Sequence, residues 1–145
     1  MALFVVIMSL VAAESSFAQT DKLEAGGTIE KGRSLYSITD RYKLTLQADG
    51  NLVLLKMVVK SDSRGKTQIS GGTVLWNSQT AGRDVENAVM QADGNFVLYA
   101  PDGKAVWNTK THKYPGSVLK LQTDGNLVIY NAQGKAVWNT GTNGK

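Results

Sequence analysis

The chain has 145 residues, of which 16 are Lys or Arg and 12 are Asp or Glu, and it contains no cysteine. Its length suits a single domain with its own core, and the missing cysteines exclude thiol chemistry, disulfides and cysteine-based metal sites. The basic residues are scattered rather than clustered, so the positive charge does not predict binding to nucleic acid.

Residues 1–18 differ in composition from the rest of the chain. Residues 2–13 are almost entirely apolar but too few to span a membrane, and a Ser-Phe-Ala sequence ending at residue 18 fits a small-x-small cleavage site. We therefore predict a secretory signal peptide over residues 1–18, a secreted protein and no membrane insertion. An uncleaved start stays open as an alternative, since no Lys or Arg precedes Lys22.

After residue 22 the helical periodicity is weak. Apolar runs of four to seven residues alternate with clusters of Gly, Asp and Asn, and the chain has 15 glycines against two prolines. This pattern is typical of many short strands joined by tight turns, and it predicts an all-β domain.

One pattern, Gln-x-Asp-Gly-Asn-x-Val, occurs three times, and each copy is followed by a Trp-Asn-Ser/Thr segment. The copies begin at Gln47, Gln91 and Gln122, and the tryptophans are Trp76, Trp107 and Trp138. The tryptophans are 31 residues apart in both intervals. A fixed period with recurring polar residues predicts a repeat architecture whose units share one structural role and one binding role.

The Asp-Gly pair decides how the motif bends. On one unbroken strand the alternating residues would spread over roughly 26 Å, too far for one small ligand, whereas Asp-Gly favours a hairpin turn. A three-residue loop over residues 92–94 would place Gln91 opposite Asn95 and keep Val97 and Tyr99 on the same face. A two-residue loop would separate Gln91 from Asn95. The interleaved residues are expected on the opposite, core-forming face: Leu52, Leu54, Phe96, Leu98, Leu127 and Ile129.

The tryptophans recur once per repeat, which favours a structural role. We expect the three rings to meet near a threefold axis and to fill the core rather than stack on a ligand.

The first repeat is irregular. Its motif and its tryptophan are separated by 13 more residues than in the other repeats, and residues 60–72 are polar and rich in Gly and Ser. We predict an insertion at about residues 56–72 that forms either a longer hairpin or a mobile loop at a tip.

The three motifs resemble the signature of the bulb-type, monocot mannose-binding lectins, Gln-x-Asp-x-Asn-x-Val-x-Tyr. The resemblance covers residues 22–145, a domain for which it implies the β-prism II fold, with three four-stranded antiparallel sheets around a pseudo-threefold axis. It implies binding of mannose or mannose-rich glycans and glycoproteins, without a metal or cofactor.

In this family the Asp and Asn hold the 2-hydroxyl of mannose, the Gln its 3-hydroxyl and the Tyr its 4-hydroxyl, while the Val packs against ring carbons. The resemblance implies two complete sites, formed by Gln91, Asp93, Asn95, Val97 and Tyr99 and by Gln122, Asp124, Asn126, Val128 and Tyr130.

Two features depart from the family pattern. The first copy has Gln47, Asp49, Asn51 and Val53, but Leu55 stands where the tyrosine belongs. Because leucine cannot hydrogen-bond a hydroxyl, we expect a weak or silent site. The second departure is the absence of the cysteine pair that plant members commonly carry within one repeat, which leaves other lineages open as the source.

Four hydrogen bonds of ~1 kcal/mol each correspond to a millimolar site, so useful binding has to be multivalent. The resemblance implies a homodimer formed by exchange of the C-terminal strand, and residues 139–145 are short enough and rich enough in Gly and Thr to serve as the exchanged arm.

The sequence also bears on two other functions. An enzyme is disfavoured, because His112 is the only histidine and the repeated aspartates belong to separate repeats instead of facing each other across one bond. A lectin-like antagonistic or protein-binding prism, as in bacteriocin-like or taste-modifying relatives, would need little sugar affinity. Two intact motifs argue against it.

Overall fold

The computed structural model describes residues 20–145, and within them it contains strands and no helix. The predicted signal peptide lies outside the described residues. The strands are, in chain order, β1 (Lys22–Leu23), β2 (Thr28–Glu30), β3 (Ser34–Tyr36), β4 (Tyr42–Leu46), β5 (Leu52–Ser61), β6 (Thr67–Asn77), β7 (Asn87–Met90), β8 (Phe96–Tyr99), β9 (Ala105–Asn108), β10 (Val118–Leu121), β11 (Leu127–Tyr130) and β12 (Ala136–Asn139). In this part of the chain, no helix could cross a membrane.

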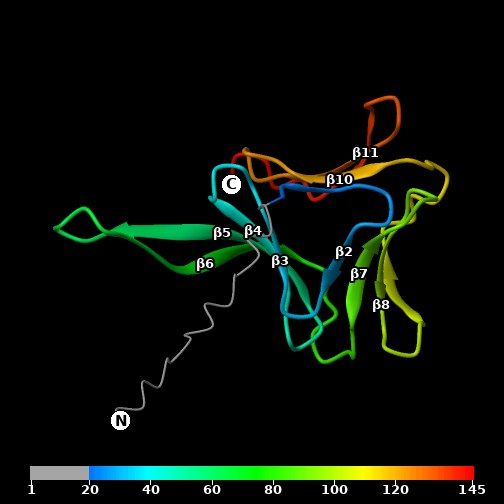
Figure 1. Ribbon diagram of the computed structural model, residues 1–145, viewed down its shortest axis with the longest axis horizontal. Helices are drawn as coiled ribbons and strands as arrows, with labels where there is room; N and C mark the ends of the chain where they lie inside the picture. The colour runs from blue at the N-terminus through cyan, green and yellow to red at the C-terminus, as the bar shows by residue number, and fades with distance from the viewer. Residues whose placement is uncertain (1–19) are drawn as a thin grey trace, which may run out of the picture.

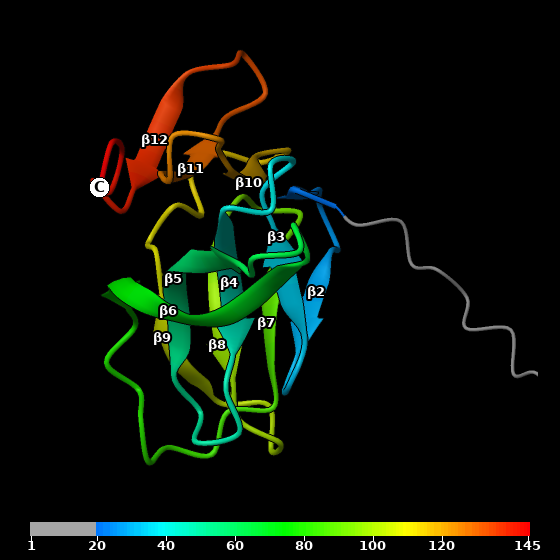
Figure 2. The same cartoon turned by 90° about the vertical axis from the view of Figure 1, so that its left-hand side faces the viewer.

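The strands form three antiparallel sheets of four strands each, in the orders β1-β10-β11-β12, β2-β7-β8-β9 and β3-β4-β5-β6. Figures 1 and 2 show the sheets set around a common centre like the sides of a prism. This arrangement confirms the predicted all-β fold with three four-stranded sheets.

The segment before the first repeat crosses all three sheets and gives one edge strand to each of them. β1 joins the sheet of the third repeat, β2 that of the second and β3 that of the first. Beside β1, the exposed ammonium of Lys22 and carboxylate of Glu24 lie 2.8 Å apart. Their hydrogen bond and opposite charges raise the pKa of Lys22 and lower the pKa of Glu24.

The interior is filled by alternate residues of the repeated strands. Leu52 and Leu54, Phe96 and Leu98, and Leu127 and Ile129 have no exposed surface, which confirms that they form the core. Because a fully buried side chain of this size contributes about 1.5–3 kcal/mol, these residues are a major source of stability in a chain without disulfides.

The three tryptophans meet in one cluster. Ring centroids are 5.6 Å apart for Trp76 and Trp107, 5.8 Å for Trp76 and Trp138, and 6.1 Å for Trp107 and Trp138, all edge to face. The rings are half-buried and pack against the core. They join the three repeats, as the regular spacing predicts.

The insertion in the first repeat is a long hairpin formed by β5 and β6, so the hairpin alternative is correct. Its tip is closed by Asp62, whose carboxylate accepts hydrogen bonds from the backbone N–H groups of Arg64 and Lys66 at 2.9 Å. The outer part of this hairpin projects beyond the other strands of its sheet (Figure 1).

Candidate functional site

The repeated motif folds as a hairpin with a three-residue loop. In the second repeat the N–H of Gln91 donates to the carbonyl of Asn95 at 2.9 Å, and the N–H of Gly94 donates to the carbonyl of Gln91 at 3.0 Å. Gln91 therefore lies opposite Asn95, and the two-residue alternative is excluded. The corresponding bonds of 2.9 Å join Gln47 to Asn51 and Gln122 to Asn126.

The aspartate of each motif stabilises its own turn. One carboxylate oxygen of Asp93 accepts a hydrogen bond of 2.9 Å from the N–H of Asn95, and Asp124 does the same for Asn126. Both aspartates are exposed. The second carboxylate oxygen of each remains available to a ligand as an acceptor.

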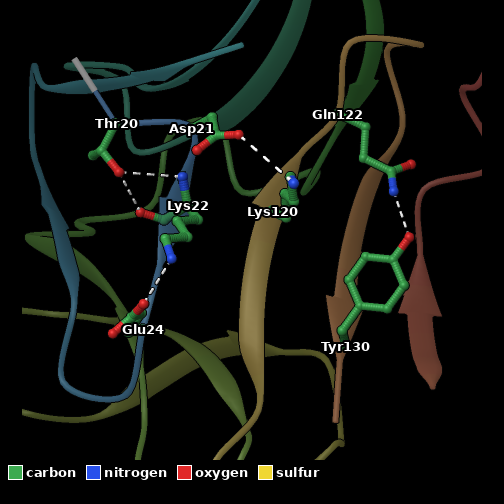
Figure 3. Close-up of polar contacts among 7 residues, drawn as sticks. All are labelled: Thr20, Asp21, Lys22, Glu24, Lys120, Gln122 and Tyr130. Carbon is green, nitrogen blue, oxygen red and sulfur yellow. Dashed lines mark hydrogen bonds and ion pairs between the residues drawn. The ribbon is translucent and has the colours of Figure 1, made fainter. Parts of the chain in front are cut away.

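In both complete repeats the glutamine and the tyrosine, eight residues apart, lie in contact. The side-chain amide of Gln91 donates to the hydroxyl of Tyr99, and that of Gln122 donates to the hydroxyl of Tyr130 (Figure 3). Each hydroxyl keeps its own hydrogen for donation to a ligand. The turn and the strand pairing thus bring the glutamine and the tyrosine of each complete motif together.

The valines are more deeply buried than their expected role suggests. Val97 is 2% exposed and Val128 is 3% exposed. Each valine can therefore offer only a small contact area to the carbon atoms of a sugar ring.

The asparagines have a structural role that the sequence analysis missed. The side-chain carbonyl of Asn95 accepts hydrogen bonds from the Thr109 hydroxyl and the Thr111 N–H, both at 3.2 Å. Its amide also donates to the side chain of Asn108 at 3.4 Å. Asn95 therefore has one amide hydrogen left for a ligand.

The residues that hold Asn95 belong to a loop found in all three repeats, Trp-Asn-Ser/Thr-x-Thr. In the second copy the hydroxyls of Thr109 and Thr111 are 2.7 Å apart, and Thr111 donates to the carbonyl of Gly94 at 2.6 Å. Ser78 with Thr80 and Thr140 with Thr142 make the same contacts. In the sequence, the threonine two residues after each Trp-Asn-Ser/Thr segment marks these contacts. We call the two paired hydroxyl side chains of each loop its clamp.

The glycine of each Gln-x-Asp-Gly-Asn motif lies close to a neighbouring segment. Gly94 has a φ of 92°, and a methyl group on it would overlap the carbonyl group of Tyr114 and lie 2.9 Å from that of Thr111. Gly94 is thus required both by its backbone conformation and by the close approach of the following loop.

The first repeat has the same turn but lacks the polar pair. Leu55 occupies the place of Tyr99 and Tyr130, opposite Val74 where the other sheets have Ala105 and Ala136. Leu55 has no hydroxyl to accept a hydrogen bond from Gln47. This repeat keeps Gln47, Asp49, Asn51 and Val53, with Val53 3% exposed.

His112 lies exposed in the loop after β9. Among residues 20–145 no group of three His, Cys, Asp or Glu side chains is placed to hold a metal ion.

Comparison with solved structures reveals close relatives of this fold. A lectin from Marasmius oreades is 36% identical, with a TM-score of 0.69 over 85% of this chain and 92% of its own. A monomeric monocot mannose-binding lectin from Gastrodia elata is 33% identical, with a TM-score of 0.67 over 86% and 99%. The mannose-specific agglutinin of snowdrop (Galanthus nivalis) bulbs, solved with methyl-α-D-mannoside, is 31% identical, with a TM-score of 0.57 over 84% and 96%.

No protein-family model matches the chain, and no curated protein sequence does. The three-sheet prism with its repeated motif defines a lectin, a non-catalytic class of protein, and not an enzyme. The chain belongs to the family of bulb-type, monocot mannose-binding lectins.

Proposed function

We propose that this protein binds mannose and mannose-rich glycans through two sites, at the motifs of the second and third repeats. The observation that carries the proposal is the glutamine–tyrosine pair present in both motifs and lost from the first. The same motifs also offer an exposed aspartate and the remaining amide N–H of an asparagine. Donors and acceptors of this kind suit the adjacent hydroxyls of a sugar ring.

The aspartates are the best residues with which to test the proposal. We expect the protein to be retained on mannose-agarose and eluted by free mannose, and Asp93→Ala with Asp124→Ala to abolish retention. Asp49→Ala, in the first repeat, removes the same turn contact outside the two proposed sites and is the matched control. Retention of the folded double variant would refute the assignment of the sites.

Failure of the folded wild-type protein to bind mannose would instead favour a protein-binding or antagonistic prism. No feature of residues 20–145 favours that function over sugar binding.

Because the expected affinity of each site is only millimolar, strong binding requires several sites to engage a glycan at once. Two sites on one chain that engage the same branched glycan would raise the avidity by roughly 10²–10⁴. Dimerisation by exchange of β12 would double the number of sites. The related Gastrodia lectins are monomeric.

The C-terminal residues make contacts that an exchange would have to reproduce between two chains. β12 pairs with β11 of the same chain, and the N–H of Gly144 donates to the carbonyl of Asp124 at 2.8 Å. An exchanged dimer would contain these same contacts between partners. A monomeric mass in light scattering at high concentration would exclude the dimer.

We also propose that the protein is secreted and that residues 1–18 are removed. Expression of the full chain in a secreting host should yield a product that starts at about Gln19, which N-terminal sequencing of the secreted protein would establish. Retention of the protein in the cell with Met1 in place would contradict it.

A further inference from the structure

The third repeat has a hollow beside its motif. It measures about 250 Å³ and is lined by Asp21, Ile38, Lys120, Gln122, Thr123 and Asp124. Gln122 and Asp124 belong to the proposed mannose site, whereas Asn126 and Tyr130 do not line the hollow. The hollow therefore adjoins the site and shares one wall with it.

Two of the lining residues, Lys120 and Asp21, occupy positions that have an equivalent in each of the other two sheets. Lys120 pairs with Val128, as Val89 pairs with Val97 and Thr45 with Val53. The carbonyl of Asp21 accepts a hydrogen bond from Leu121, as Gly27 accepts one from Met90 and Arg33 from Leu46. The second site thus has valine and glycine where the third has lysine and aspartate.

Asp21 and Lys120 form an ion pair at 4.0 Å, next to Gln122 (Figure 3). The Asp21 side chain is 16% exposed and that of Lys120 is 45% exposed, so Lys120 can still donate to a ligand and Asp21 can still accept from one. Ile38, 74% exposed, adds an apolar surface from the loop after β3.

The charges around the hollow disfavour an anionic ligand. Its lining residues include two carboxylates, Asp21 and Asp124, and one ammonium, that of Lys120, so an added anion would meet a net negative charge. A sugar ring has hydroxyls that both donate and accept, together with apolar C–H groups. The volume is slightly below the roughly 300–1,000 Å³ of small-molecule sites, which suits one ring.

We propose that this hollow is a second sugar subsite, which gives the third site a preference for a disaccharide unit, whereas the second site contacts a single mannose. The inference rests on the proposed mannose-binding function. Asp21 and Lys120 contact the second sugar residue, Ile38 packs against its ring, and the first residue occupies the motif.

The test compares methyl α-D-mannoside with α1,2-, α1,3- and α1,6-linked mannobiosides by NMR titration. In Asp93→Ala, which leaves the third site, one linkage should bind about tenfold tighter than the monosaccharide, as expected for one or two additional hydrogen bonds. In Asp124→Ala, which leaves the second site, this ratio should stay below about twofold.

Adding Asp21→Ala and Lys120→Val to Asp93→Ala gives the third site uncharged residues like those of the second. The disaccharide preference should then fall below about twofold, with the affinity for methyl α-D-mannoside unchanged. Ile38→Ser, at an exposed position, should reduce the disaccharide preference in the same way. It provides the test if the variant with Asp21→Ala and Lys120→Val does not fold.

Equal ratios in the two single-site variants, or a preference that survives these substitutions, would overturn the subsite. Failure of the folded wild-type protein to bind methyl α-D-mannoside would refute the proposed function itself, so the two results are distinguishable.

Discussion

At the scale of single residues, Leu55 distinguishes the first repeat from the other two. The turn and the aspartate contact of that repeat are intact, so the missing hydroxyl is the main chemical difference from the complete motifs. Val74 faces Leu55 where the other sheets have alanine, and it would crowd a tyrosine at this position.

We predict that Leu55→Tyr combined with Val74→Ala creates a third mannose site. Tyr at position 55 would accept a hydrogen bond from Gln47 and present its own hydroxyl hydrogen to a sugar. The stoichiometry for methyl α-D-mannoside in an NMR titration should rise from two to three. Val74→Ala alone is the control, and a stoichiometry of two for the folded double variant would show that more than the hydroxyl is missing.

Gly94 provides a second test at this scale, because a matched glycine exists in the same repeat. Gly94→Ala should destabilise the protein by more than about 2 kcal/mol, since strain at positive φ adds to overlap with the Tyr114 carbonyl. Gly103 has a φ of 82° and open space around it, so Gly103→Ala should cost about 1 kcal/mol. Urea unfolding measures both, and equal losses would contradict the packing argument.

At the scale of the elements, the Trp-Asn-Ser/Thr-x-Thr loop holds each motif hairpin in place. Thr111 is 3% exposed, and its hydroxyl contacts both Thr109 and the carbonyl of Gly94. The orientation of Asn95 depends on this clamp, because Asn95 accepts hydrogen bonds from the same two threonines.

We predict that Thr111→Val destabilises the protein by about 1–3 kcal/mol, because it leaves buried polar groups without partners. Mannose affinity at the second site should also fall, since the Thr109 hydroxyl that donates to Asn95 and the Gly94 carbonyl of the motif turn both lose the Thr111 hydroxyl, while the third site is unaffected. Thr73→Val, at an exposed position on β6, is the control and should change stability by less than about 0.5 kcal/mol. An unchanged stability of the Thr111→Val variant would show that the clamp is dispensable.

The sequence predicts the repeated hairpins and their core residues because both follow from local rules. Asp-Gly selects the turn, and alternation then assigns Phe96 and Leu98 to the interior. It does not predict the path of β1 and β2, because each pairs with a strand far away along the chain. The structural role of Asn95 was missed for the same reason, since its partners are 14 and 16 residues away.

At the scale of the whole molecule, the threefold arrangement gives three motifs one scaffold and allows each to diverge. The first has lost its tyrosine and gained the long β5–β6 hairpin, and the third has gained the charged pair of Asp21 and Lys120. The tryptophan cluster and the buried strands remain common to all three. Binding differences between the sites therefore arise from a few surface residues on one shared core.

The most direct test of the proposed function is a titration of the wild-type protein with methyl α-D-mannoside, followed by NMR of the backbone amides. We predict two sets of shifted amides, around residues 91–99 and 122–130, with millimolar affinity. Asp93→Ala should remove only the first set and Asp124→Ala only the second. Shifts around residues 47–55 instead, or no shifts at all in the folded protein, would contradict the two-site account.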